Sequence, residues 1–151
     1  MAKIDVKIKG DEELERKFDS LKRSIGDNKK LMGQIGAFSN LQIKQRTAKG
    51  VDYQSNLFKP YSPNYKEIRK QAGRPTNKVD LNFTGSMLSA LTYKQTKNKV
   101  QLFFINSSDK FGARNPEKAF YNNQTREFFA LSADDISKIE NIVIDYINEN
   151  F

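Results

Sequence analysis

The side chains of this chain that could support acid–base chemistry are carboxylates, and they occur in two adjacent pairs. The pairs are Glu12–Glu13 and Asp134–Asp135. Each pair stands where a helix is expected to begin, a position at which carboxylates accept hydrogen bonds from free backbone amides and are stabilised by the helix dipole. Because neighbouring helix residues do not converge on one point, neither pair is placed to hold a metal ion or a reacting atom. We therefore interpret both pairs as helix caps.

Histidine and cysteine are missing from the sequence. These side chains are the commonest general base, thiol nucleophile and transition-metal ligands, so a zinc site would have to be built from carboxylates alone. Segments 84–86 and 112–114 contain glycine but lack the glycine and lysine spacing of a phosphate-binding loop. We expect no catalytic, metal-binding or cofactor-binding residue, and we predict that the protein is not an enzyme.

Basic and acidic residues are segregated along the chain, whose net charge is +8 at neutral pH. Between residues 44 and 78 nine basic residues face only two acidic ones, whereas between residues 127 and 151 one lysine faces six acidic residues. Such asymmetry suits head-to-tail contacts between subunits or a basic face near nucleic acid, and it is equally compatible with an ordinary solvated surface. The residues that we predict to face a partner or DNA are Lys59, Lys66, Arg69, Lys70, Arg74 and Lys78.

Aromatic residues are interleaved with the basic ones in the same part of the chain. They are Tyr53, Phe58, Tyr61 and Tyr65. Single-stranded nucleic acids stack their bases on surfaces of this composition. The stretch also contains prolines and a capped turn, so the rings could equally dock the loop onto the fold. A basic nucleic-acid-binding module is therefore kept as the alternative function, with loose electrostatic contact to DNA favoured over reading of its sequence.

Hydrophobic periodicity predicts the elements that must position these residues. Alternation over residues 3–9 predicts a strand, and residues 11–25 predict a helix capped by Asp11. A second, longer helix is expected from about residue 31 to residue 48. The side chains expected to line its buried face are Leu31, Ile35, Phe38 and Leu41.

Two interior glycines, Gly33 and Gly36, weaken this second helix by about 1 kcal/mol each relative to alanine. We expect close packing against a neighbouring element to offset that loss. Segment 50–80 holds three of the four prolines and has no sustained periodicity. It is expected to be a long loop that carries one short helix, with Ser62 as N-cap and Pro63 at the first position. Loops of this length are uncommon unless they are functional, which suggests contact with a partner.

The second half of the chain alternates short elements. Thr84 is expected to cap a brief helix, and segments 91–96 and 100–105 predict a β-hairpin. Segment 106–125 is expected to be irregular, because it contains Gly112 and Pro116. A last helix should follow, opened at Ser132 by a variant of the capping box with Asp135.

This order of elements predicts one α+β domain covering residues 1–151. Its expected architecture is a small, mostly antiparallel sheet packed against two long helices, with a long proline-containing loop. The sequence has no apolar run long enough to cross a bilayer, so we expect no membrane partner and synthesis in the cytoplasm.

Three spaced motifs occur in the last two thirds of the chain. The first is segment 58–65, FKPYSPNY, the second is segment 81–91, LNFTGSMLSAL, and the third runs from AFYNN at 119–123 to REFFALS at 126–132. In order and spacing they resemble the phage virion morphogenesis and tail-completion family, which shades into head–tail connector proteins of the phage neck. The family usually has Trp where Phe58 stands, and commonly has His where this chain has Asn122 or Asn123. The matching positions are Phe58, Pro60, Ser62, Pro63, Tyr65, Leu81, Thr84, Gly85, Ser89, Arg126 and Phe128.

The resemblance implies a structural virion protein that completes the tail or joins head to tail. Such a subunit would assemble as a ring, with six copies expected, around the DNA passage. Its partners would be other neck and tail proteins, such as head-completion, tail-terminator or tail-tube proteins. The motif residues would then serve structure and assembly, and the protein would reach the virion neck or tail after assembly in the host cytoplasm. The other interpretation of the motifs is a small cytoplasmic domain whose Pro, Gly and Ser residues merely turn the chain.

Overall fold

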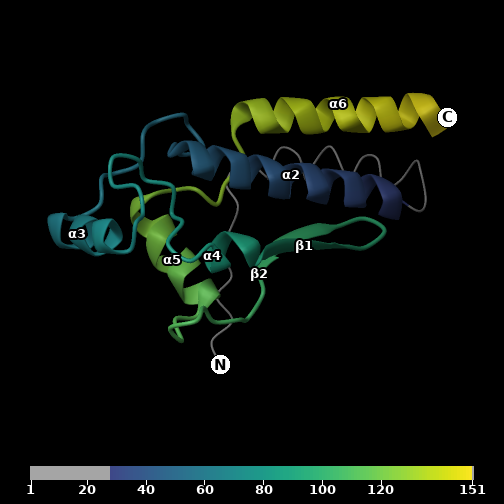
Figure 1. The fold of residues 1–151 in the computed structure, drawn as a ribbon. Helices are drawn as coiled ribbons and strands as arrows, with labels where there is room; N and C mark the ends of the chain where they lie inside the picture. Colours follow the sequence, from purple (N-terminus) through teal and green to yellow (C-terminus); the bar gives the residue numbers. More distant parts are fainter. Residues whose placement is uncertain (1–27, 151) are drawn as a thin grey trace.

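The computed structural model describes residues 28–150, which form a small α+β fold (Figure 1). The strand predicted over residues 3–9 and the helix predicted over residues 11–25 lie outside this part. Within it, no helix combines the length and apolar character needed to cross a membrane. The elements are α2 (Lys29–Lys49), α3 (Pro63–Gln71), α4 (Ser86–Ser89), β1 (Leu91–Gln95), β2 (Val100–Phe104), α5 (Asn115–Thr125) and α6 (Ala133–Asn150).

Helix α2 lies between two other layers. Helix α6 packs along one side of it, and the β1–β2 hairpin lies on the opposite side (Figure 1). The antiparallel sheet and the two long helices are confirmed, although α6 packs mainly against α2 and not directly on the sheet. Helices α3, α4 and α5 gather at the C-terminal end of α2 (Figure 1). Gly50 ends α2 there, in the left-handed conformation (φ 79°).

The buried side of α2 differs in part from the predicted one. Leu31 and Ile35 are buried as expected, but the prediction for Leu41 is wrong, because this side chain is 52% exposed. A helix covered on two sides needs small residues where a neighbour approaches closely. A prediction from the spacing of large apolar side chains does not identify such positions. The seam towards the hairpin and the main core consists of Met32, Gly36, Ser39, Ile43 and Thr47.

The hairpin is confirmed to within a residue at each end, and its register determines which side chains meet α2. Tyr93 pairs with Leu102, and the Tyr93 ring lies against Gly36 of the helix. Side chains alternate between the two faces of a strand, so the pairs two residues away on either side face α2 as well. The opposite face of the hairpin carries Thr92, Lys94, Gln101 and Phe103.

Two predictions in the second half of the chain are wrong. Segment 106–125 is not irregular throughout, because α5 occupies its last part. Pro116 lies in the first turn of that helix, where its missing N–H costs nothing, and does not break it. Thr84 is not the N-cap of α4 either: Gly85 holds that position with φ 81°, and Thr84 Oγ1 instead accepts a hydrogen bond from the Ser86 N–H at 3.3 Å.

Helix α6 begins as the sequence predicts. The Ser132 hydroxyl accepts a hydrogen bond from the Asp135 N–H at 3.0 Å, and the Asp135 carboxylate accepts one from the Ser132 N–H at 2.9 Å. The same carboxylate is buried and forms an ion pair with Arg46 of α2 at 2.5 Å. Arg46 also donates to the carbonyl of Ala130. The cap therefore ties α6 to α2 in addition to starting the helix.

The two glycines of α2 provide a matched pair for testing this packing. A Cβ at Gly36 would lie 2.3 Å from Cδ2 of Tyr93, so we expect Gly36→Ala to lower the free energy of unfolding by about 1–3 kcal/mol. A Cβ at Gly33 would meet only the flexible end of Gln95 at 3.2 Å. Gly33→Ala should therefore be neutral or gain up to about 1 kcal/mol of helix propensity. Urea denaturation of both variants measures the difference, and equal shifts would contradict this packing.

Candidate functional site

The three sequence motifs meet at Tyr61. Its hydroxyl accepts a hydrogen bond from the Leu81 N–H at 3.0 Å, which joins the first motif to the second. Arg126 of the third motif donates to the carbonyls of Lys59 at 2.8 Å and Pro60 at 3.1 Å. Segments more than 60 residues apart in the sequence are thus bonded through their motif residues.

Arg69 was predicted to face a partner or DNA, and this prediction is wrong, because its side chain is completely buried. Nε donates to the carbonyl of Pro75 at 2.8 Å, and one terminal nitrogen donates to the carbonyl of Asn82 at 3.1 Å. The other forms an ion pair with Asp80 at 3.1 Å. A buried charge is tolerated only when it is paired and its donors are satisfied, which this arrangement achieves.

Two guanidinium groups lie over the ring of Tyr61. The Arg69 Cζ is 4.6 Å from its ring centroid, and the Arg126 Cζ is 5.2 Å from it, both within cation–π distance. Burial raises the pKa of the Tyr61 hydroxyl, with the Arg69 charge acting in the opposite direction. The neutral phenol is therefore retained to higher pH, in keeping with its role as a buried hydrogen-bond acceptor.

The other residues predicted to face a partner remain available at the surface. Lys66 is partly exposed, and the rest of the group is exposed. Of the four interleaved rings, Phe58 and Tyr61 are buried, so they dock the loop and cannot stack on bases. Tyr53 and Tyr65 are partly exposed. The exposed cations of the predicted group are Lys59, Lys70, Arg74 and Lys78.

Most of the remaining motif residues have identifiable structural roles. Ser62 is confirmed as the N-cap of α3, since its hydroxyl accepts the Tyr65 N–H at 3.3 Å, and Pro63 follows at the start of the helix. Phe58 and Phe128 belong to the same core cluster. Pro60 and Ser89 are exposed, and nothing in the described part of the chain gives the Ser89 side chain a structural task.

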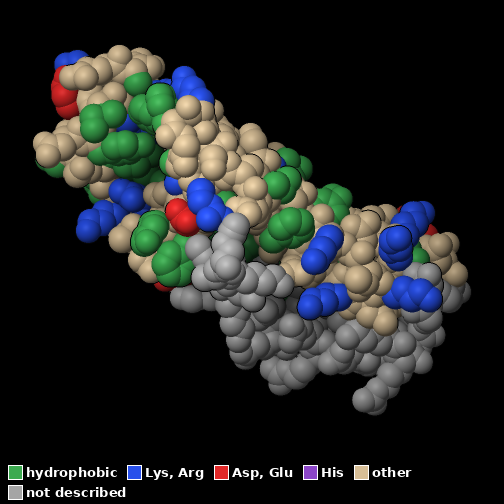
Figure 2. All heavy atoms as spheres, turned by 90° about the horizontal axis from the view of Figure 1, so that it is seen from below, with side chains coloured by type: hydrophobic (Ala, Val, Ile, Leu, Met, Phe, Trp, Pro, Cys, Tyr) green, Lys and Arg blue, Asp and Glu red, His purple; other side chains and the backbone are tan. Residues whose placement is uncertain are grey.

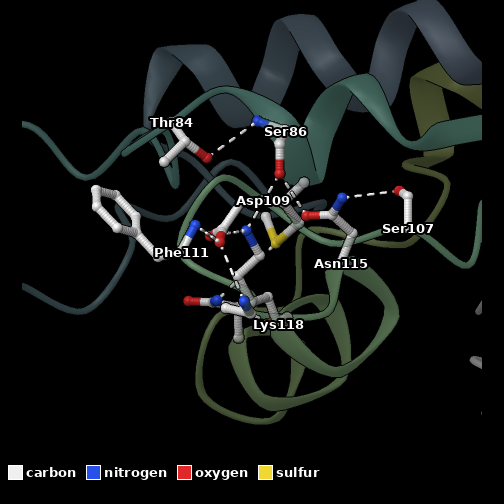
Figure 3. Close-up of polar contacts among 10 residues, drawn as sticks. Thr84, Ser86, Ser107, Asp109, Phe111, Asn115 and Lys118 are labelled. Carbon is white, nitrogen blue, oxygen red and sulfur yellow. Dashed lines mark hydrogen bonds and ion pairs between the residues drawn. The ribbon is translucent and has the colours of Figure 1, made fainter.

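A cavity of about 190 Å³ lies beside the second motif, between α4, α5 and the loop before α5. Lys118 bridges its polar wall, donating to Asp109 Oδ2 at 2.8 Å and to the Ser86 hydroxyl at 3.3 Å (Figure 3). The Ser86 hydroxyl in turn donates to Asn115 Oδ1 at 2.6 Å. The residues that line the cavity are Tyr65, Leu81, Phe83, Thr84, Gly85, Met87, Asp109, Lys118 and Asn122.

This cluster holds the loop in place and does not activate Ser86. A serine nucleophile needs a neighbouring base that can take its proton. Lys118 Nζ instead forms an ion pair with Asp109 and donates to the Ser86 hydroxyl, and that hydroxyl donates to Asn115 Oδ1. Among residues 28–150, no three acidic, His or Cys side chains are grouped so that they could bind a metal ion.

The sequence does not reveal the network around Lys118, because all its members except Ser86 lie in the segment expected to be irregular. Asp109 accepts hydrogen bonds from the backbone N–H groups of Phe111 and Ala113, at 2.9 and 3.0 Å. An Asp three residues before Gly112 is typical of such a turn, and Pro116 is typical of a helix start. Together these two signals could have located the loop and α5.

No family model, curated protein or solved structure matches this chain. The likeness of the three motifs to virion morphogenesis proteins therefore stays a prediction. What the structure adds is that the three motif segments are hydrogen-bonded to one another, and that Phe58, Leu81 and Phe128 among the matching positions are buried.

Arg69 offers a direct test of the buried ion pair. Replacing it with methionine leaves Asp80 without its opposite charge and the Pro75 and Asn82 carbonyls without their Arg69 donors, so Arg69→Met should lower the free energy of unfolding by about 3–5 kcal/mol. Lysine cannot reproduce the planar fork of donors, so Arg69→Lys should also be destabilising. The control Lys70→Met changes an exposed neighbour and should stay within about 0.5 kcal/mol of wild type. Equal stabilities of Arg69→Met and Lys70→Met would disprove the role of Arg69.

The Asp109 network makes the loop before α5 sensitive to acid. The hydrogen bond from Lys118 holds the pKa of Asp109 below its usual range, and the two backbone N–H groups act in the same direction. The ionised Asp109 carboxylate therefore contributes its full stabilisation of the fold above the pKa of an unfolded-state Asp, about 3.9. This contribution is lost as the pH falls through the lower pKa of Asp109 in the folded state. Lys118→Met should raise the pKa of Asp109, whereas Lys110→Met, at an exposed neighbour, should leave it unchanged. Titration of the Phe111 and Ala113 amide resonances measures both, and identical midpoints in the two variants would contradict this assignment.

Proposed function

We propose that this protein is a structural subunit of a tailed-phage virion, which completes the tail or joins head to tail. In this proposal it assembles as a ring around the DNA passage and contacts other neck and tail proteins. The observation that carries the proposal is the junction around Tyr61, where the matching positions Leu81 and Arg126 of the second and third motifs are hydrogen-bonded to the Tyr61 hydroxyl and the Pro60 carbonyl of the first motif segment. Motif positions that form one junction have a shared physical role, which unrelated turn residues would lack.

The exposed apolar side chains support an assembly role. Most of the large ones lie at the end of the molecule formed by α3, α5 and their loops, and Figure 2 shows hydrophobic side chains gathered there. Phe111 is 69% exposed and Tyr121 is 66% exposed. Large apolar groups at the surface commonly become the buried anchors of protein contacts.

The distribution of charge fits contacts between unlike faces of neighbouring copies. Exposed cations lie on and around α3, while α6 carries Asp145 and Glu149 on its exposed side. Helix α3 and the end of α6 are at opposite ends of the molecule (Figure 1). Contacts between different faces of identical subunits generate rings when the rotation closes, which is the assembly proposed here.

Base stacking by the interleaved rings, the alternative function, is not favoured. It would require exposed rings, and two of the four candidates, Phe58 and Tyr61, are buried in the fold. Loose contact between surface lysines and phosphates is compatible with a subunit that lines a DNA passage.

The proposal predicts concentration-dependent assembly of the full chain. Light scattering and electron microscopy should detect rings, either alone or after co-expression with the products of neighbouring genes. The double variant Phe111→Ser with Tyr121→Ser should weaken assembly without changing the melting temperature, because both side chains are exposed. The control Leu41→Ser removes an exposed apolar group on α2 and should assemble normally. A chain that stays monomeric and joins no virion component would refute the proposal.

A further inference from the structure

We propose that the β1–β2 hairpin and the first turn of α2 form a phosphate-binding surface for the backbone of double-stranded DNA. This lysine surface consists of Lys29, Lys30, Lys94, Lys97 and Lys99. It is distinct from the basic segment 59–78. The identity of the polyanion rests on the proposed function, in which DNA passes through the assembly.

The surface is built from the two longest acid-free stretches of the described chain. Residues 28–51 and residues 81–108 contain no Asp or Glu at all. They are separated by about 30 residues in the sequence, but α2 packs against both strands of the hairpin. The fold therefore places positive charge beside positive charge, with no anion supplied by either segment.

Two contacts bring the hairpin tip to the start of α2. A Cβ at Gly33 would be 3.2 Å from Gln95 at the end of β1, and Val100 at the start of β2 packs against the cluster that contains Leu31 and Met32. The tip, residues 96–99, therefore lies close to the first turn of α2. All five lysines of the surface are exposed.

The hairpin face turned away from α2 has the composition of a backbone-binding surface. Lys94 is exposed, and its ammonium nitrogen lies 5.7 Å from the Phe103 ring centroid, within cation–π distance. Thr92 and Gln101 occupy the same face and can donate hydrogen bonds to phosphate oxygens. Seen from below, Lys and Arg side chains project at several points over the hairpin end of the molecule (Figure 2).

Helix α2 separates the hairpin part of this surface from the acidic residues of α6. Glu140, Asp145 and Glu149 belong to α6, which lies on the other side of α2 from the hairpin (Figure 1). A helix is about 10–12 Å wide with its side chains, and the Debye length at physiological ionic strength is about 8 Å. Repulsion between these carboxylates and a DNA strand at the hairpin is therefore largely screened.

All five cations of the surface are lysines, which favours contact with phosphates over the reading of bases. Lysine acts as a point charge towards phosphate and lacks the planar fork with which arginine reads guanine. Each lysine that meets a phosphate releases bound counterions, so the affinity must fall steeply with added salt. The expected binding is independent of DNA sequence.

Two triple variants with equal charge test the location. The tip variant removes three positive charges from the hairpin by Lys94→Gln, Lys97→Gln and Lys99→Gln. The control variant removes three exposed positive charges elsewhere by Lys59→Gln, Lys70→Gln and Lys78→Gln. Fluorescence anisotropy with a random-sequence duplex is measured over a salt series. The tip variant should reduce the slope of log affinity against log salt by about 2.7 and weaken binding up to about 500-fold at 0.1 M salt. The control variant should change the salt slope and the affinity far less. Neither triple variant should change the melting temperature.

Equal losses in the two variants would overturn the inference, because they would show that only the net charge matters. Absence of DNA binding by the wild-type chain would overturn it as well. So would equally tight binding of poly-glutamate, which would indicate an acidic protein as the partner. Ring formation is measured separately on the same samples. Loss of DNA binding with intact rings supports the inference, whereas salt-dependent binding by a chain that never assembles would refute the virion proposal alone.

Discussion

A guanidinium with no exposed surface is the constraint around which segment 58–83 is folded. Moving such an ion out of water costs several kcal/mol unless its charge and its donors are satisfied. Asp80 supplies the opposite charge to Arg69, and the carbonyls of Pro75 and Asn82 take further N–H groups. These acceptors lie beyond α3 in the sequence, so the chain must turn back over the helix. The turn places Leu81 in the left-handed conformation (φ 53°), where its N–H reaches the Tyr61 hydroxyl.

The consequence for function is that part of the family-like motifs is used to build the interior of the protein. Tyr61 is enclosed by two arginines, and Phe58 and Phe128 share one core cluster. Residues with such roles set the shape of the α3–α5 end but cannot touch a partner themselves. Recognition is left to side chains that this framework holds at the surface, such as Phe111 and Tyr121. The length of loop 50–80, from which we predicted contact with a partner, is therefore accounted for by its packing around Arg69 and Tyr61.

Burial of α2 on two sides organises the other end of the molecule. The absence of a side chain at Gly36 of α2 lets the hairpin approach closely, with the Tyr93 ring lying against the helix backbone. On the opposite side, the ion pair between Arg46 and Asp135 anchors the start of α6. The helix thus separates a lysine-bearing hairpin from an acidic helix. This separation allows one end of a small protein to present two faces of opposite charge.

The sequence by itself determined the α+β class, the hairpin, and the caps at Ser62 and Ser132, because these depend on contacts between residues close in the chain. It also predicted close packing at both interior glycines of α2, which is confirmed at Gly36 beside Tyr93, whereas a Cβ at Gly33 would meet only the flexible end of Gln95. It could not distinguish Arg69 from its exposed neighbours, because guanidinium burial depends on acceptors that only the folded loop supplies. The sequence likewise did not reveal the lysine surface, because neither the start of α2 nor the hairpin is unusually basic by itself. Only tertiary packing brings them together, since charge adds up in space and not along the chain.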